Sequence, residues 1–331
     1  MTALSRRACI RLAGAVAVSC GAAGLTKAAA GSQTLTIYAA GTLAGAFHAV
    51  DTAFEKANPG ATVEPQFGGS VMMARRIVDL HQQADIIAVA DYSVIPKYLF
   101  GQNGKPRLAD WYVGFARNAI TFVYTPNSKG ASDLATHKWY DVLGQPGVEI
   151  GRSNPDTDPS GYQTLQMLSL AENYYKVPGL AARILANAPA RNIRDTETEL
   201  IAALQLGQID YLAIYRSDAV QHHLEAIELP PEINLADPKR AASYAAAIAH
   251  TKNGDLRGKP IVYAATIPKS AANAALAAKY LALLLGGEGQ AVIARDGFGT
   301  MTPALAVNPQ QTPAALRALV QPWPTNRAGA L

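Results

Sequence analysis

Cysteine is almost absent from this sequence of 331 residues, and its two cysteines, Cys9 and Cys20, both lie in the first twenty positions. If the chain is cut after residue 30, no disulfide, thiol nucleophile or thiolate metal ligand remains. Aromatic residues make up only 7% of the chain, although sugar sites usually present aromatic platforms. Gly-x-Ser-x-Gly, Walker and dinucleotide-binding motifs are absent, and the six histidines have no zinc-like spacing. The sequence therefore gives catalysis no positive support.

The first thirty residues differ in composition from the rest. Three arginines precede an apolar run over residues 12–25, and three alanines follow at residues 28–30. The run is shorter than the roughly 20 residues that span a bilayer, so we predict a signal peptide over residues 1–30. Its start resembles a twin-arginine signal, and a Sec signal fits nearly as well. A lipid anchor at Cys20 is the alternative to cleavage near Ala30.

Removal of this leader changes the charge of the chain. Four of the 29 basic residues and none of the 25 acidic residues lie in it, which leaves 25 of each sign. A net charge of zero gives no indication of a surface for nucleic acid or anionic membrane. Because domains hold roughly 100–200 residues, the remaining chain is expected to form two lobes.

Strands and helices alternate in the first part of the chain. Strands are expected at residues 34–40, 61–67 and 85–90. Apolar residues at helical spacing predict helices over residues 43–57 and over a second segment whose inward face ends at Leu80. The third strand is apolar throughout, as in parallel sheets covered on both faces, so the fold class is α/β.

The remaining elements continue this alternation. Further strands are expected at residues 118–124, 147–151, 209–215 and 260–267, and further helices at residues 139–143, 164–175, 197–206 and 276–284. Crossovers near residues 115–119 and 258–265 predict two doubly wound lobes: lobe 1 at residues 31–116 and 265–331, and lobe 2 at residues 117–264.

Two glycine-rich junctions each connect a strand to the start of a helix, at Gly41-Thr42-Leu43 and Gly68-Gly69-Ser70. A helix start offers free N–H groups and the positive end of its dipole, and glycine lets an anion approach the backbone. Thr42 and Ser70 add hydroxyl donors. Both junctions fall at the carboxyl edge of one sheet, which favours an anion site; two ordinary N-caps are the alternative interpretation.

Two acidic segments allow several functions. Asp156 and Asp158 lie in a turn-rich loop and could hold a divalent cation, although Asp158 beside Pro159 is more typical of a helix cap. Glu197 begins a helix, where an acidic residue complements the dipole. Asp158 and Glu197 could also form a glycosidase pair, and an exported carbohydrate enzyme remains an alternative.

Several motifs occur in a characteristic order along the chain. They are Ala40-Gly41-Thr42-Leu43, Gly69-Ser70-Val71, Ala90-Asp91-Tyr92-Ser93-Val94-Ile95-Pro96, Asp158-Pro159-Ser160-Gly161-Tyr162, Gly207-Gln208-Ile209-Asp210-Tyr211, Tyr215-Arg216-Ser217 and Pro260-Ile261-Val262-Tyr263. This order resembles the tungstate/molybdate-binding component of ABC importers, in the branch common in archaea.

The resemblance implies a type II periplasmic-binding fold that clamps an oxyanion between two lobes, with no cofactor and no enzymatic activity. It also implies a monomer outside the cytoplasm and an ABC permease as partner. The carboxylates of Asp158 and Glu197 would approach the tungsten or molybdenum atom itself. The ligand contacts implied in this way are Thr42, Leu43, Ser70, Asp158, Pro159, Ser160, Glu197 and Tyr215. A sulfate- or phosphate-binding protein is the alternative.

Overall fold

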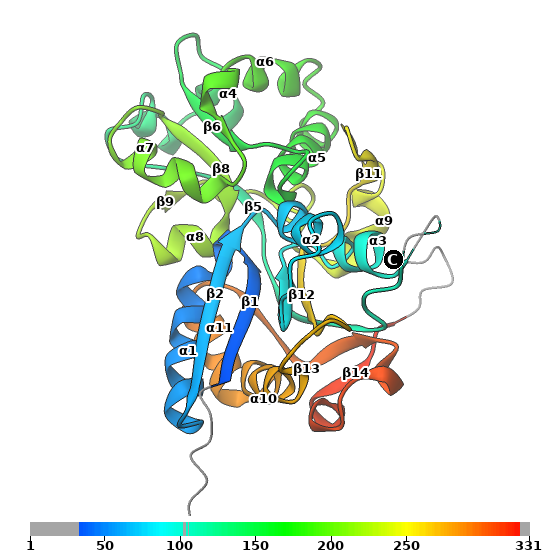
Figure 1. Ribbon diagram of the computed structural model, residues 1–331. Coiled ribbons are helices and arrows are strands. Elements are labelled where there is room, and N and C mark those ends of the chain that lie inside the picture. The colour runs from blue at the N-terminus through cyan, green and yellow to red at the C-terminus, as the bar shows by residue number, and fades with distance from the viewer. Residues whose placement is uncertain (1–32, 102–103, 105, 325–331) are drawn as a thin grey trace, which may run out of the picture. The chain divides into compact units, whose positions relative to one another are not determined.

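The computed structural model describes residues 33–101, 104 and 106–324. The signal-peptide prediction therefore lies outside the described residues. The described chain forms two main β-sheets, of seven and five strands, and a separate hairpin (Figure 1). Helices connect and cover the strands, which confirms the α/β prediction.

The seven-stranded sheet combines the beginning and the end of the chain, in the order β14-β13-β4-β12-β3-β1-β2. Its strands are β1 (Gln33–Ala40), β2 (Ala61–Gly68), β3 (Ile86–Val89), β4 (Tyr112–Arg117), β12 (Val262–Thr266), β13 (Gly299–Val307) and β14 (Val320–Pro322). β1 runs parallel to β2 and β3, whereas β12 runs antiparallel to β3 and β4. The carboxyl ends of β1, β2 and β3 therefore meet at one edge.

Alternating side chains of β1 assign helices to the two faces of this sheet. Ile37 belongs to the same apolar cluster as Phe47 and Tyr280, whereas Tyr38 belongs to a second cluster with Met73 and Ile77. α1 and α10 therefore cover one face and α2 covers the other. The helices associated with this sheet are α1 (Ala44–Ala57), α2 (Ser70–Val78), α3 (Val94–Leu99), α10 (Ala274–Leu285) and α11 (Gly287–Arg295).

The five-stranded sheet is formed by the middle of the chain, in the order β7-β6-β8-β5-β9. Its strands are β5 (Ile120–Tyr124), β6 (Ile150–Ser153), β7 (Ile193–Arg194), β8 (Tyr211–Tyr215) and β9 (Glu225–Ala226). The helices of this segment are α4 (Trp139–Leu143), α5 (Pro159–Tyr175), α6 (Leu180–Ala186), α7 (Ile201–Gln205), α8 (Arg216–Gln221) and α9 (Ala241–Tyr244). The hairpin of β10 (Ile248–Thr251) and β11 (Gly254–Arg257) packs on α5.

Short 3₁₀-helices occur in several connections. They are η1 (Gly41–Leu43), η2 (Ala131–Ala135), η3 (Ala190–Asn192), η4 (Glu197–Leu200), η5 (Pro238–Arg240), η6 (Pro309–Gln311) and η7 (Ala314–Leu319). Two of them, η1 and η4, carry residues of the predicted site.

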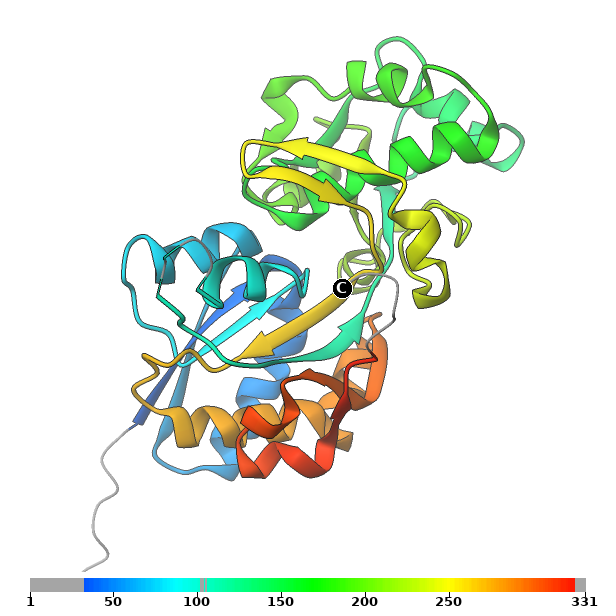
Figure 2. The same ribbon diagram turned by 90° about the vertical axis from the view of Figure 1, so that its right-hand side faces the viewer.

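Two segments connect the sheets and lie side by side. One leads from β4 to β5 and the other from β11 to β12 (Figure 2), and the N–H of Asn118 in the first donates to the carbonyl of Ile261 in the second at 3.3 Å. Both segments fall within the predicted crossovers. The predicted boundary at residues 264/265 lies inside β12, and the division into two lobes stays a prediction.

Three of the predicted elements need correction. Leu80 lies beyond the end of α2 and is 64% exposed, because the helix stops at Val78 before a turn. The strand expected at residues 147–151 is β6, at Ile150–Ser153. The helix expected from residue 164 begins at Pro159, whose fixed φ suits the first turn of a helix. The predicted α4 is confirmed.

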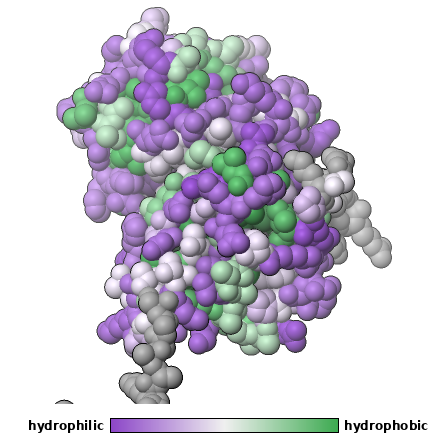
Figure 3. Space-filling model, viewed as in Figure 1, coloured by the Kyte–Doolittle hydropathy of each residue, from purple (hydrophilic) through white to green (hydrophobic). Residues whose placement is uncertain are grey.

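Few large hydrophobic side chains are exposed in the described part of the chain; they are Leu80, Tyr174, Leu206 and Val220. The face in Figure 3 is mainly hydrophilic, with scattered hydrophobic patches. In the described part of the chain, no helix combines the length and the apolar character needed to cross a bilayer.

Candidate oxyanion site

The two glycine-rich junctions lie at the shared edge of β1 and β2, as predicted. η1 follows β1 directly, and α2 begins at Ser70 directly after β2. Thr42 is 2% exposed and Ser70 is fully buried. The N–H of Met73 bonds to the carbonyl of Gly69, so the N–H groups of Ser70 and Val71 precede the bonds of the helix. This edge therefore presents free amide donors in a buried place.

The hydroxyls at these junctions do not act as N-caps, so the capping alternative is wrong. The N-cap of α2 is Gly69, and the Ser70 Oγ accepts from the N–H of Ala90 at 2.9 Å. The Thr42 Oγ1 lies 2.8 Å from the Tyr263 hydroxyl, with either group able to donate. Contacts to neighbouring strands thus fix both hydroxyl groups.

The acidic residues approach from the five-stranded sheet, and they share one hydroxyl. The Ser160 Oγ lies 2.8 Å from Asp158 Oδ2 and 3.0 Å from Glu197 Oε2, and 2.6 Å from the Ser153 Oγ. Asp158 is the N-cap residue of α5 by position, yet its side chain makes no capping bond. Asp158 therefore occupies the predicted cap position, but its carboxylate accepts from the Ser160 hydroxyl and not from a backbone N–H of the helix.

The electrostatics of this group follow from its burial. Asp158 and Glu197 are 3% and 2% exposed, and among the described residues neither forms an ion pair with a basic side chain. Burial, and then the nearby Asp158 carboxylate, raise the pKa of Glu197 well above its usual value. The Ser160 hydroxyl has a single hydrogen and can donate to only one of the two carboxyl groups.

The two halves of the site are in contact. The N–H of Met72 on α2 donates to the carbonyl of Thr157 at 3.3 Å, next to Asp158. A Cβ atom at Gly69 would lie 2.6 Å from that carbonyl oxygen, and a Cβ atom at Gly41 would lie 3.0 Å from the Thr198 Oγ1. Glycine at these junctions allows the close approach. The structure therefore brings the two junctions, Asp158 and Glu197 to one place.

The other predicted ligand contacts lie nearby, but their roles stay predictions. Leu43 is fully buried at the start of α1, and Pro159 is buried between Asp158 and Ser160. The Tyr215 hydroxyl, at the end of β8, donates to Gln163 Oε1 at 2.8 Å. Tyr215 can serve an oxyanion only by exchanging this partner.

Sequence reasoning missed three polar residues beside the site. The Tyr263 hydroxyl contacts Thr42 and accepts from Asn118 Nδ2 at 3.2 Å, and Asn118 also donates to Ser217 at 2.8 Å. Asp218 is 1% exposed, and its burial raises its pKa. Tyr263 belongs to one of the motifs quoted above, which was the only available signal. Asn118 and Asp218 give no signal in the sequence.

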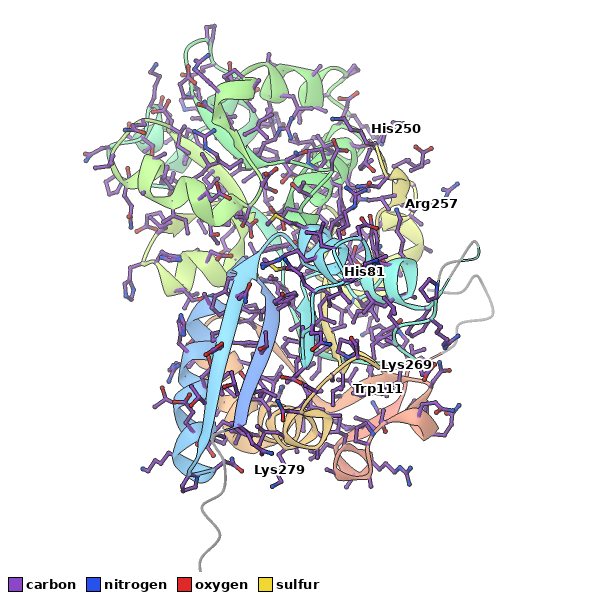
Figure 4. The ribbon with its side chains drawn as sticks, viewed as in Figure 1. His81, Trp111, His250, Arg257, Lys269 and Lys279 are labelled. Carbon is purple, nitrogen blue, oxygen red and sulfur yellow. The ribbon has the colours of Figure 1, made fainter. Side chains whose placement is uncertain are left out.

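The arrangement argues against one alternative. Asp156 Oδ1 accepts from the N–H of Lys252 at 2.8 Å, whereas the Asp158 carboxylate contacts Ser160, so the two carboxylates do not converge on a cation. Among the described residues, no group of three or more His, Cys, Asp or Glu side chains could hold a metal ion. His81 lies in the loop after α2 and His250 lies on β10, well apart in Figure 4.

The protein has two sheets, two connecting segments that lie side by side, and a polar site at strand ends. This arrangement is that of a binding protein with the type II periplasmic fold. In agreement, the periplasmic molybdate-binding protein of Azotobacter vinelandii superposes with a TM-score of 0.59 at 19% identity, covering 81% of this chain and 99% of that one. The family of bacterial extracellular solute-binding proteins matches residues 35–299, and the chain belongs to this family.

Relatives in sequence agree with this membership. A solute-binding protein of Petrotoga mobilis is 36% identical over 289 residues, which cover 86% of this chain and 88% of the relative. The molybdate/tungstate-binding protein WtpA of Thermococcus kodakarensis is 35% identical over 316 residues, 87% of each chain.

Proposed function

We propose that the protein captures tungstate or molybdate outside the cytoplasm and delivers it to an ABC permease, without catalysing a reaction. The named Thermococcus relative, similar over 87% of its length, supports this ligand class. The single observation that carries the proposal is the pair of buried carboxyl groups, Asp158 and Glu197, which share the Ser160 hydroxyl beside the glycine-rich junction at Gly69.

The physical argument concerns the central atom of the ligand. A carboxylate repels the oxygens of sulfate, which carry no proton to donate at neutral pH, and a buried site without an ion pair makes that repulsion costly. Tungsten and molybdenum have vacant d orbitals and can accept two further oxygen ligands, whereas sulfur in sulfate cannot. The same two acids therefore favour one class of tetrahedral oxyanion and reject the other.

The proposed transport role extends this site. Closure around the ligand replaces its water with fixed donors, and the closed form is the one that the permease recognises. We further propose export by a cleavable signal over residues 1–30, with a lipid anchor at Cys20 as the alternative, and function as a monomer.

Isothermal titration calorimetry with tungstate, molybdate, sulfate and phosphate tests the proposal. We expect tight binding of the first two only. Glu197→Gln should weaken tungstate binding about 100-fold or more, because an amide is a poor ligand for the metal. Glu199→Gln is the matched control, since Glu199 lies in the same short helix but is exposed. Sulfate binding as tight as tungstate binding would refute the proposal and favour a sulfate-binding protein.

A further inference from the structure

A buried carboxylate next to the site joins three separate parts of the chain. Asp91, just after β3, is 1% exposed. Its Oδ2 accepts from the Tyr162 hydroxyl on α5 at 2.7 Å and lies 3.0 Å from the Lys259 Nζ. Its Oδ1 accepts from the N–H of Ser93 at 2.8 Å. Asp91 therefore connects the first sheet, the segment that returns to it, and the principal helix of the second sheet.

Asp91 is held in its ionised form. Burial alone would disfavour the charge, but Lys259, Tyr162 and the N–H of Ser93 outweigh it and lower the pKa of Asp91. Lys259 itself is 18% exposed in its side chain and donates to the Ser93 Oγ at 2.7 Å. A buried charge with these partners makes strong, directional hydrogen bonds.

The contact lies close in sequence to residues of both halves of the proposed oxyanion site. Asp91 follows Ala90, whose N–H fixes the Ser70 hydroxyl. Tyr162 lies two residues after Ser160, in the first turn of the helix that begins at Pro159. The Tyr162–Asp91 bond therefore sets the position of the acidic end of α5 relative to the amide donors of α2 (Figure 1).

We propose that Asp91 and Tyr162 are positioning residues for ligand binding, whose hydrogen bond forms as the two halves close and holds Asp158 and Ser160 over the oxyanion. This inference rests on the proposed function. Of the three partners of Asp91, only Tyr162 comes from the second sheet. When the halves separate, Asp91 keeps Ser93 and Lys259 and exchanges the tyrosine for water.

Tyr162→Phe tests the role because it removes only the hydroxyl. A hydrogen bond to a charged group is worth enough to raise the Kd for tungstate roughly 10- to 100-fold. The increase should appear in the dissociation rate, with the association rate little changed. Stopped-flow fluorescence and calorimetry measure both. The melting temperature of the ligand-free protein should change little, since the open form lacks the bond.

Tyr280→Phe is the matched control. The Tyr280 hydroxyl also donates to a buried aspartate, Asp51 Oδ1, at 2.7 Å, but both residues belong to helices of the first sheet. This variant should lower the melting temperature and leave the tungstate affinity at the wild-type value. Equal loss of affinity in both variants would overturn the inference, because it would indicate a general effect on folding.

Asp91→Ala provides a second measurement if Tyr162→Phe fails to fold, because alanine, unlike asparagine, cannot accept from the Tyr162 hydroxyl. We expect each single variant to weaken tungstate binding, and the double variant to be little weaker than Asp91→Ala, because both changes remove the same hydrogen bond. Additive losses, or wild-type Kd and dissociation rate in Tyr162→Phe, would overturn the inference. Absence of tungstate binding by the wild-type protein would instead refute the proposed function.

Discussion

Asp51 on α1 allows a quantitative prediction about stability. This carboxyl is 7% exposed; its Oδ1 accepts from Tyr280, whereas its Oδ2 has no hydrogen-bond partner and lies 3.9 Å from the His48 Nδ1. Burial raises the pKa of Asp51 from 3.8 to about 6. The folded protein therefore binds this proton more tightly than the unfolded chain, in which the group keeps its ordinary pKa.

The sign of the pH dependence follows from this difference. The contribution of Asp51 to the free energy of unfolding is fully present below about pH 4 and is lost as the pH rises through about 6. A shift of about two pKa units corresponds to ~3 kcal/mol. Asp51→Asn is neutral at every pH and can still accept from Tyr280, so it escapes this loss. We expect it to be about 1–3 kcal/mol more stable than the wild type at pH 8.

Urea unfolding, followed by circular dichroism at pH 4 and pH 8, measures the effect. The other titrating groups are common to both proteins and cancel in the difference between them. Glu64→Gln, an exposed site on β2, is the matched control and should show no such pH-dependent gain. A wild-type protein more stable than Asp51→Asn at pH 8, or a difference that is the same at both pH values, would refute the reasoning.

Three further predictions follow from packing. Gly69→Ala should weaken tungstate binding at least tenfold by calorimetry, while the melting temperature of the ligand-free protein stays unchanged. The reason is that the added Cβ would lie 2.6 Å from the Thr157 carbonyl oxygen only in the closed form. Gly287→Ala, with open space around it, is the control. Ser160→Ala should lower the free energy of unfolding by about 1–3 kcal/mol in urea, since two buried carboxyls lose their shared hydroxyl, and an unchanged midpoint would contradict this. Phe47→Ala should cost about 3–5 kcal/mol in the same assay without altering the tungstate Kd of the folded protein, because Phe47 is fully buried in the core.

The sequence predicted best those features that depend on local periodicity. β1, α1 and β2 lie within a residue or two of their expected ends, because alternating apolar residues and a terminating Asn58-Pro59-Gly60 segment determine them locally. Leu80 was placed wrongly on α2 because apolar spacing alone does not show where a helix ends. Tertiary context decides whether such a residue is buried.

The composition of the site could be predicted only in part. Strand-to-helix junctions identified Thr42 and Ser70, since parallel strands bring their carboxyl ends to one edge. The resemblance, and not residue spacing, identified Asp158 and Glu197. The contact between Asp91 and Tyr162 joins positions 71 residues apart. It depends on how the two sheets meet, which no local pattern in the sequence encodes.

Asp91 and Glu197 are both buried near the site, but they differ in their hydrogen-bond partners. Asp91 has a lysine, a tyrosine and an amide as partners, so it stays ionised, and its bonding capacity is used within the protein. Glu197 has no basic partner among the described residues; its Oε2 accepts from the hydroxyls of Ser160 and Thr196. Burial, and then the nearby Asp158 carboxylate, raise its pKa, and its oxygens remain available to a better partner. Burial of a carboxyl group without a cationic partner lowers the free energy of unfolding. Evolution is expected to remove such a group unless it stabilises a bound ligand. An electron-accepting metal centre inside an oxyanion is such a ligand. We therefore expect Glu197→Gln both to stabilise the ligand-free protein and to abolish tungstate binding. Such a result would assign the loss of stability and the ligand contact to the same carboxyl group.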